Sequence, residues 1–208
     1  MSASLSLQEG LTGLGLTVPA GTQDKLLAYL ALVQKWNKVY NLTAVREPGK
    51  MLTHHLLDSL AVAPHVQDAN TLLDVGSGAG LPGIPLAMAL PQLHVTLLDS
   101  NQKRTTFLRQ VKMQLALANV TVVCERVEKH QQKQRYSVVI SRAFAGLREF
   151  VTMAGHLLAP GGQLIAMKGA DPAAEITQLK SGFVTTGVTK LSVPGLDAER
   201  HLVFLKAA

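Results

Sequence analysis

One stretch of the sequence, residues 71–86, constrains the fold more than any other. It consists of a short apolar run, a loop with glycine at alternate positions and two prolines (TLLDVGSGAGLPGIPL). An apolar run of this length is typical of a buried strand, and proline is compatible with the first turn of a helix. Glycine lets the backbone turn sharply and approach a ligand closely. The stretch therefore predicts a strand, a nucleotide-binding loop and a helix, in that order.

The glycine spacing and the preceding acid distinguish two classes of nucleotide ligand. Dinucleotide oxidoreductases use Gly-x-Gly-x-x-Gly, with a pyrophosphate at the helix N-terminus. Here Gly76, Gly78 and Gly80 alternate, and Leu81 occupies the position of the last glycine in that motif. Asp74 would repel a pyrophosphate but tolerates a ligand that carries an amine and a sulfonium. The loop therefore favours S-adenosylmethionine; a glycine turn that only packs a strand against a helix is the structural alternative.

The composition narrows the class of protein. The chain has 208 residues, of which 47% are hydrophobic, enough for a sizeable core. No apolar run is long enough to span a membrane, and the N-terminus lacks the layout of a signal peptide. Cys124 is the only cysteine and the histidines are scattered, so we expect neither a disulfide nor a metal site. These features predict a cytoplasmic protein without membrane or metal, and we expect a monomer.

The charge balance indicates a class of partner. The chain has 20 lysines and arginines against 14 acidic residues, which gives a formal net charge of +6. The isoelectric point is about 9.6. A basic surface of this size favours a polyanion such as RNA, although a generally basic protein has the same charge balance.

Two regions with different patterns follow each other along the chain. Residues 1–66 show the apolar spacing of helices, with helices expected at about 22–38 and 50–63. From the glycine loop onward, strand-like runs alternate with helical segments. This alternation predicts an α/β fold, a mostly parallel sheet covered by helices on both faces. We therefore expect a helical cap at residues 1–66 and a Rossmann-like domain at residues 67–208, in one compact unit.

The elements of the second region follow from the same patterns. Asn101 is expected to cap the helix after the second strand, and a Pro-Gly-Gly turn at 160–162 to precede the fifth strand. Strands are expected at about 71–75, 95–99, 120–124, 138–140, 163–167, 183–191 and 202–206, and helices after the glycine loop and at about 101–117, 146–158 and 171–180.

Polar residues at the strand ends are the candidate ligand contacts, because such sheets bind ligands beyond the carboxyl ends of their strands. Asp99 ends the second strand, where a carboxylate can accept hydrogen bonds from both ribose hydroxyls of a nucleoside. Capping the next helix is the alternative role. Val127 and Glu128 follow the third strand and either flank an adenine or begin a solvated helix. Arg142 follows the fourth strand, where a buried guanidinium requires an anion.

Several segments together resemble the ribosomal RNA small subunit methyltransferase G family, also called GidB. The specific ones are the Asn-Leu-Thr segment at 41–43 and the Leu-Pro-Gly-Ile-Pro extension of the glycine loop at 81–85. The resemblance spans nearly the whole chain. Its motifs lie at 35–43, 55–59, 74–86, 97–104, 126–128, 141–144, 168–169 and 199–201.

The resemblance implies a class I methyltransferase whose seven-stranded sheet has an antiparallel last strand. It implies methyl transfer from S-adenosylmethionine to N(7) of one guanine, guanine 527, in the 16S rRNA of the small ribosomal subunit. It also implies that the cofactor is contacted by Gly76, Leu81, Val127, Glu128 and Arg142, with Asp99 on the ribose. Together with the loop residues Asp74, Gly78 and Gly80, these form the predicted cofactor site.

The implied chemistry makes few demands on side chains. Guanine N(7) has a free lone pair and no proton, so methyl transfer to it needs no general base. The sequence accordingly has no Asn-Pro-Pro-Tyr motif of amino-methylating enzymes and no obvious pair of histidine and carboxylate. We therefore assign no catalytic residue with certainty and expect catalysis by positioning, with Arg142, Lys168 and Arg200 as the candidates.

Basic residues around the strand ends are the candidate RNA contacts. Lys168 follows the fifth strand, and Arg200 and His201 precede the last, so we expect them to meet RNA phosphates. Lys103 and Arg104 lie on the helix after the second strand, where a solvated face is the alternative. In the cap, His55, Asp58 and Ser59 either order the cap over the cofactor or make structural hydrogen bonds.

Three other functions compete with this interpretation. The first is an NAD-dependent oxidoreductase, disfavoured by Asp74 and by the missing glycine at Leu81. The second is a non-catalytic factor for rRNA binding or ribosome assembly that has kept the fold. The third is methylation of a protein or small molecule, which the basic charge disfavours.

Overall fold

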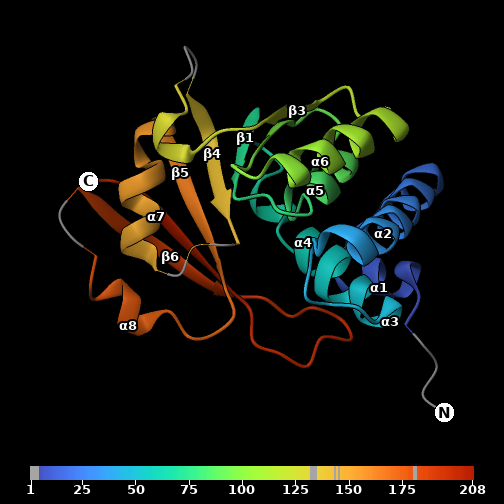
Figure 1. Ribbon diagram of the computed structural model, residues 1–208. Helices are drawn as coiled ribbons and strands as arrows, with labels where there is room; N and C mark the ends of the chain where they lie inside the picture. The colour runs from blue at the N-terminus through green and yellow to red at the C-terminus, as the bar shows by residue number, and fades with distance from the viewer. Residues whose placement is uncertain (1–4, 132–134, 143, 145, 180–181) are drawn as a thin grey trace.

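The computed structural model describes residues 5–131, 135–142, 144, 146–179 and 182–208, which form a seven-stranded sheet flanked by helices (Figure 1). The strand order is β3-β2-β1-β4-β5-β7-β6, and each of the seven predicted strands is present. The strands are β1 (Thr71–Val75), β2 (His94–Leu98), β3 (Val120–Val123), β4 (Tyr136–Ser141), β5 (Leu158–Lys168), β6 (Phe183–Lys190) and β7 (His201–Ala207).

β1 is an interior strand of the sheet and pairs in parallel with both β2 and β4. The chain proceeds from β1 to β2 and β3 on one side and then returns to β4 on the other, so its direction across the sheet reverses between β1 and β4. β7 is antiparallel to both β5 and β6. This arrangement confirms the predicted α/β sheet. It also brings the carboxyl ends of β1 to β5 to one edge, where such sheets bind ligands.

The helices cover the two faces of the sheet in two groups (Figure 1). α5 (Gly83–Ala89) and α6 (Gln102–Gln114) lie on one face together with the N-terminal helices. α7 (Leu147–Ala154) lies on the other face, with α8 (Ala173–Ile176) packed beside it. A larger cluster of buried apolar side chains fills the first interface and a smaller one fills the second.

The N-terminal helices form a cap that packs against the glycine loop and the helices next to it. α2 (Ala20–Tyr40) contacts α5 and α6, and the Trp36 ring lies 5.5 Å from that of Phe107. The Tyr29 hydroxyl, which is fully buried, donates to the backbone oxygen of Ala79 in the loop (2.7 Å). The cap also contains α1 (Leu7–Gly13), α3 (Pro48–Met51), a π-helical segment (Leu52–Leu57), α4 (Asp58–Leu60) and a 3₁₀ turn (Ala63–His65).

Some boundaries differ from the sequence prediction for local reasons. α2 begins directly after Pro19, because proline suits the position before a first turn, and it extends two residues past the predicted end. The segment predicted as one helix at 50–63 contains the π-helical turn at 52–57, which apolar spacing does not reveal. Residues 160–162, predicted as a turn, lie within β5, where the register against β4 shifts in the manner of a bulge.

Helix lengths in the second half of the chain also differ from the prediction. The helix predicted at 101–117 ends at Gln114, two residues before Ala116, whose φ of 51° is left-handed. The helix predicted at 146–158 becomes a 3₁₀ turn (Gly155–Leu157) after α7. That predicted at 171–180 shortens to α8 in the described residues. The strand positions were predicted more accurately where a strand is a short apolar run, as in β1 and β2; β5 begins five residues before its predicted start.

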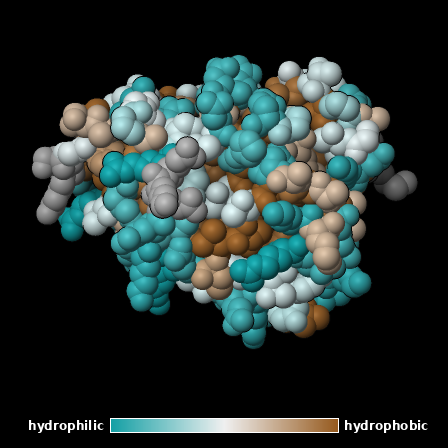
Figure 2. Space-filling view, turned by 90° about the horizontal axis from the view of Figure 1, so that it is seen from above, coloured by the Kyte–Doolittle hydropathy of each residue, from teal (hydrophilic) through white to brown (hydrophobic). Residues whose placement is uncertain are grey.

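The surface is mostly hydrophilic on the side away from the carboxyl ends of the strands. The β4 arrow points downward in Figure 1, and Figure 2 shows the molecule from above. Polar side chains cover most of that face, and hydrophobic area is confined to smaller patches (Figure 2). Among the described helices, none has the length and apolar character needed to cross a membrane.

The junction between β1 and α5 is tightly packed. Gly83 opens α5, and a Cβ atom there would lie 2.4 Å from Leu97 Cδ2 and 2.8 Å from Asp74 Oδ2. The Gly83 N–H donates to that carboxylate oxygen (2.9 Å). Asp74 is fully buried, and desolvation raises its pKa to about 7, although the Gly83 hydrogen bond and the Arg142 charge oppose the rise. Asp74 thus connects the end of β1 to the start of α5.

We expect Gly83→Ala to destabilise the protein by about 1–3 kcal/mol, because the added methyl group enters a fully packed junction. The free energy of unfolding, measured by urea denaturation, checks this. Gly21→Ala is the matched control, because a Cβ at Gly21 meets no atom within 4 Å and α2 is helical there. The control should be neutral or slightly stabilising. Equal stability of Gly83→Ala and wild type would contradict the packing argument.

The raised pKa of Asp74 predicts a pH-dependent difference between the wild type and Asp74→Asn. The unfolded state loses the Asp74 proton near pH 4 and the folded state near pH 7, so the folded state binds more protons between them. The stability of the wild type relative to the variant should therefore be greatest below about pH 4. It should fall by about 1.4 kcal/mol per pH unit as the pH rises toward 7. Urea denaturation across this range measures the difference; a constant difference would show that Asp74 is ionised in the folded protein.

Candidate active site

The glycine loop follows β1 and lies against the end of β2. Gly76, Gly78 and Gly80 have φ angles of 70°, 59° and 94°, a region that side chains disfavour. Gly76 N–H donates to the backbone oxygen of Leu98 (2.8 Å). A Cβ on Gly80 would lie 2.5 Å from Ile84 Cγ1, so this glycine also permits the loop to pack on α5. The loop backbone is thereby held at the carboxyl edge of the sheet, between β1 and β2.

A first pocket lies at the ends of β1, β2 and β3, and we call it the β1–β3 pocket. Its volume is about 250 Å³. The lining combines loop backbone, apolar side chains and both signs of charge: Val75, Gly76, Leu98, Asp99, Ser100, Arg104, Glu125, Arg126, Val127, Glu128, Phe144 and Met153. Of the residues predicted to bind the cofactor, this pocket brings together Gly76, Asp99, Val127 and Glu128.

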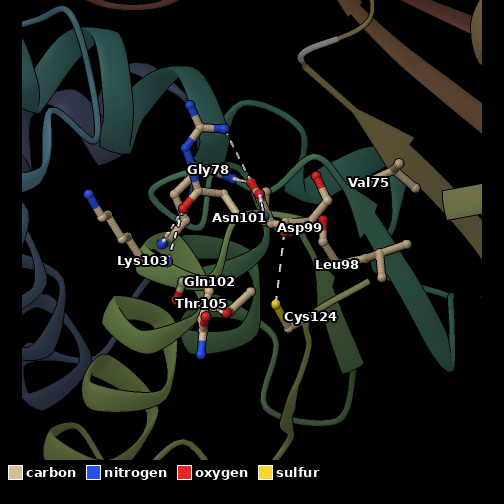
Figure 3. Close-up of polar contacts among 12 residues, drawn as sticks. Val75, Gly78, Leu98, Asp99, Asn101, Gln102, Lys103, Thr105 and Cys124 are labelled. Carbon is tan, nitrogen blue, oxygen red and sulfur yellow. Dashed lines mark hydrogen bonds and ion pairs between the residues drawn. The ribbon is translucent and has the colours of Figure 1, made fainter. Parts of the chain in front are cut away.

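Asp99 is the buried acid of the β1–β3 pocket, with 5% of its surface exposed. Its Oδ2 accepts from Gly78 N–H (2.9 Å) and its Oδ1 from Asn101 N–H (2.8 Å), as Figure 3 shows. Arg104 Nη1 lies 3.4 Å from Oδ2, a long contact made by a half-exposed side chain. Three donors leave part of the acceptor capacity of a carboxylate unused. Asp99 is therefore held in place and can still accept from a ligand, particularly where Arg104 turns away.

The start of α6 is capped by Asn101. Its side-chain oxygen accepts from the N–H groups of Lys103 (2.9 Å) and Arg104 (3.3 Å), as predicted. Asn101 therefore caps the helix, the role that was the alternative for Asp99. The Asp99 carboxylate instead accepts hydrogen bonds from Gly78 in the glycine loop and from Asn101, the residue before α6.

The loop after β3 is supported by a histidine that the sequence analysis missed. His130 is 2% exposed; its Nδ1 contacts the Glu125 carboxylate and its Nε2 lies 3.1 Å from the Tyr136 hydroxyl. Glu125 lines the β1–β3 pocket, and Val127 is buried in the 3₁₀ turn Val127–Lys129. The histidine therefore holds the residues that line this end of the pocket. A lone histidine in an irregular segment gives no sequence signal for such a role.

Five of the residues predicted to bind the cofactor are absent from the described lining of the β1–β3 pocket: Asp74, Gly78, Gly80, Leu81 and Arg142. Asp74 is buried beneath the loop. Leu81, also buried, contributes to the core under the loop and precedes a cis peptide bond to Pro82. In the structure Asp74 and Leu81 shape the loop rather than the pocket surface.

A second pocket lies beyond β4 and β5, against the cap, and we call it the β4–β5 pocket. Its volume is about 330 Å³. The cap and the strand ends both contribute to the lining: Thr43, Val45, His54, His55, Asp58, Arg142, Met167, Lys168, Gly169 and Arg200. The two pockets are neighbours along the sheet edge, because β1 pairs with β4 and Ser141 Oγ donates to the backbone oxygen of Val75 (2.8 Å).

The anion expected beside the Arg142 guanidinium is the Asp58 carboxylate. It is 1% exposed, and its Oδ2 lies 3.3 Å from Arg142 Nη1. Its Oδ1 accepts from Arg200 Nε (2.8 Å), so one carboxylate pairs with two guanidinium groups. Arg142 also donates to the backbone oxygen of His54 (3.2 Å), within the π-helical segment. Arg142 is therefore paired with the cap in the structure, and its contact with the cofactor stays a prediction.

Other polar groups of the β4–β5 pocket are also paired or neutral. Lys168 Nζ lies 2.8 Å from Glu175 Oε2, which in addition accepts from Leu147 N–H. His55 Nε2 lies 3.1 Å from Thr43 Oγ1, and burial lowers the His55 pKa to about 4. His55 is therefore neutral at physiological pH. Glu175 was not predicted from the sequence, because an acidic residue on a short helix has no distinctive sequence pattern.

The predicted RNA contacts separate into different places. Lys168 and Arg200 come together in the β4–β5 pocket, beside Arg142, which was predicted as a cofactor contact and positioning residue. Arg104 instead lines the β1–β3 pocket. Lys103 is exposed on α6, and His201 is 9% exposed between β5 and β6, paired in register with Lys168. His201 is therefore largely buried, and its contact with an RNA phosphate stays a prediction. Among the described residues, no cluster of three metal-ligating side chains is present.

Comparison with protein families and relatives gives one consistent result. The family model described as rRNA small subunit methyltransferase G matches residues 22–203. A ribosomal RNA small subunit methyltransferase G from Aromatoleum aromaticum is 52% identical over 210 residues, covering 99% of this chain and 99% of the relative. A protein of the same name from Ralstonia nicotianae is 52% identical over 207 residues, covering 96% and 93% respectively.

Solved structures share the fold at low sequence identity. The glycopeptide N-methyltransferase MtfA complexed with sinefungin has a TM-score of 0.60 at 14% identity, covering 74% of this chain and 87% of that one. The N-methyltransferase NodS from Bradyrhizobium japonicum, in complex with S-adenosyl-L-homocysteine, has a TM-score of 0.57 at 12% identity, covering 84% and 98%. These likenesses confirm the predicted Rossmann-like methyltransferase fold.

The matched region includes the glycine loop and reaches from α2 into β7, so it takes in the residues of both pockets. The identity to the relatives is distributed over nearly the whole chain rather than confined to the nucleotide-binding loop. The chain therefore belongs to the ribosomal RNA small subunit methyltransferase G family, as its motifs predicted.

Proposed function

We propose that this protein transfers the methyl group of S-adenosylmethionine to N(7) of a guanine in 16S rRNA, at the position that the family resemblance implies, guanine 527. The observation that carries the proposal is the pair of adjacent pockets at the sheet edge. One has a buried acid and a glycine loop, and the other has two arginines and a lysine. We further propose that the reaction takes place in the cytoplasm on RNA of the small ribosomal subunit.

The residues of the β1–β3 pocket fit the adenosyl part of the methyl donor. Asp99 presents a carboxylate to the ribose hydroxyls, and its position is held by two backbone N–H groups. Val127, Leu98 and Phe144 supply apolar surface for the adenine ring, and Glu128 supplies a polar edge. Gly76 allows close approach of the backbone because it lacks Cβ. No phosphate-binding group is needed for such a ligand.

The β4–β5 pocket fits the acceptor nucleotide. Guanidinium and ammonium groups favour RNA phosphates, and Arg142, Lys168 and Arg200 converge there from β4, β5 and the segment before β7. The cap closes the opposite side of the pocket with Thr43 and His55. We infer that the acceptor base enters between the cap and the strand ends, beside the methyl donor.

The chemistry that this geometry has to support is simple. The bound donor supplies a methyl group activated by its sulfonium; guanine N(7) attacks it with its lone pair, and the positive charge passes from sulfur to the purine ring. No proton moves, so the protein's task is to hold the two reactants in line. Positioning of this kind contributes about 7–11 kcal/mol to lowering a barrier. The low pKa of His55 makes it a weak proton acceptor, and Asp58 is paired with two arginines, which matches a mechanism without a general base.

The direct test is to incubate the protein with radiolabelled S-adenosylmethionine and either 16S rRNA or small ribosomal subunits, and to map the methylated base. We expect N(7)-methylguanine at a single site. RNA binding without methyl transfer to either substrate would support a non-catalytic assembly factor. Binding of NADH with no binding of S-adenosylmethionine, measured by calorimetry, would support an oxidoreductase. Transfer to protein alone would also contradict the proposal.

We expect Asp99→Asn to weaken S-adenosylmethionine binding by roughly 10-fold or more, because a charged acceptor is lost where the ribose binds. Methyl transfer should fall in parallel, whereas RNA affinity should stay within about twofold because Asp99 lies outside the β4–β5 pocket. Calorimetry and a filter-binding assay measure the two affinities. The control is Asp24→Asn on the exposed surface of α2, which makes the same charge change. Normal cofactor affinity in Asp99→Asn would refute the ribose role.

A further inference from the structure

The Arg142–Asp58–Arg200 cluster has an unusual charge balance for a pocket that receives a base destined to become cationic. Two guanidinium groups share one carboxylate, through contacts of 3.3 and 2.8 Å. The third cation of the pocket, Lys168, is matched by Glu175 (2.8 Å). Among the described lining residues the cluster thus carries two positive charges and one negative charge. It has one surplus positive charge, and its buried member is the carboxylate.

Asp58 is held too firmly to contact the substrate itself. It is 1% exposed, and both of its oxygens face arginines. The two arginines are more accessible, with 31% and 22% of their side-chain surface exposed. The part of the cluster open to an incoming RNA is therefore cationic, and the carboxylate acts through the arginines behind which it lies.

We propose that Asp58 is a positioning and charge-setting residue for methyl transfer: it holds Arg142 and Arg200 in the β4–β5 pocket and limits their surplus to one charge, matched by one RNA phosphate. This inference rests on the proposed function. With a phosphate bound, the cluster is neutral. The positive charge that arrives on the purine then meets no net repulsion from the pocket. Without the Asp58 charge, one uncompensated cation remains close to the reacting base.

The surroundings of Asp58 make this role testable, because both arginines have a second acceptor. Arg142 donates to the backbone oxygen of His54 (3.2 Å), and Arg200 Nη1 donates to the backbone oxygen of Glu199 (2.8 Å). Asparagine has nearly the shape of aspartate and keeps one oxygen acceptor. Asp58→Asn therefore removes the negative charge without leaving either guanidinium without a hydrogen-bond acceptor.

The proposal predicts opposite effects on binding and on transfer. In Asp58→Asn the RNA affinity should be equal to or tighter than that of the wild type, with a steeper salt dependence, because the pocket has gained net positive charge. The single-turnover rate of methyl transfer should fall by roughly 10-fold or more. S-adenosylmethionine affinity should not change. A variant that was merely misfolded would lose RNA affinity and transfer together.

The matched control is Glu47→Gln, which removes one negative charge from the cap at an exposed pair with Lys50. Its transfer rate should equal that of the wild type. A compensating variant, Asp58→Asn with Arg200→Gln, restores the surplus to one charge. Its transfer rate with saturating RNA should exceed that of Asp58→Asn alone, whereas a purely structural role predicts that the two losses add.

The outcomes separate this inference from the proposed function. A wild-type protein that transfers no methyl group to RNA contradicts the proposed function, and the inference with it. An active wild type together with an Asp58→Asn variant of unchanged transfer rate, or of weakened RNA binding, contradicts the inference alone. A compensating variant slower than Asp58→Asn does the same. Tight RNA binding with slow transfer in Asp58→Asn, and partial recovery in the compensating variant, supports it.

Discussion

The structure depends on the parallel pairing of β1 with both β2 and β4. This pairing sets the carboxyl ends of neighbouring strands at one edge and reverses the chain direction across the sheet between β1 and β4. The glycine loop turns away from the sheet at that point, tied to β2 through the backbone oxygen of Leu98. Asp99 is tied in turn to the loop through Gly78. The β1–β3 pocket is thus a direct consequence of strand order and glycine conformation.

The N-terminal cap contributes both to the fold and to the candidate acceptor pocket. Its Tyr29 hydroxyl donates to the backbone oxygen of Ala79 in the glycine loop. Its π-helical segment and Asp58 line the β4–β5 pocket. Three separate parts of the chain meet at the Asp58 carboxylate: the cap, the end of β4 and the segment before β7. The α/β domain without the cap would leave the ends of β4 and β5 open on that side. The cap is therefore the element that completes the β4–β5 pocket, which we propose receives the RNA.

The strands and the glycine loop were predictable from sequence, because each depends on local patterns. Apolar runs place several of the strands, and the charged residues predicted at strand ends, such as Asp99 and Arg142, line the two pockets. Interactions between distant segments were not predictable. Asp58 and Arg200 are 142 residues apart, and the π-helical turn before Asp58 has no periodicity that distinguishes it from an α-helix. The hydrogen bond from Gly83 N–H to the buried Asp74 carboxylate was also not predictable, because the sequence alone does not say which way a side chain near a strand end points.

The central claim is that the methyl donor and the acceptor guanine occupy two adjacent pockets of one sheet edge. The most direct measurement is an experimental structure of the protein with S-adenosyl-L-homocysteine and a fragment of 16S rRNA that contains the target guanine. The account predicts adenosine against Asp99 and Val127, and an RNA phosphate on Arg142 or Arg200 with the guanine beside it. A nucleotide of RNA bound in the β1–β3 pocket, or RNA phosphates that avoid the β4–β5 pocket altogether, would contradict it.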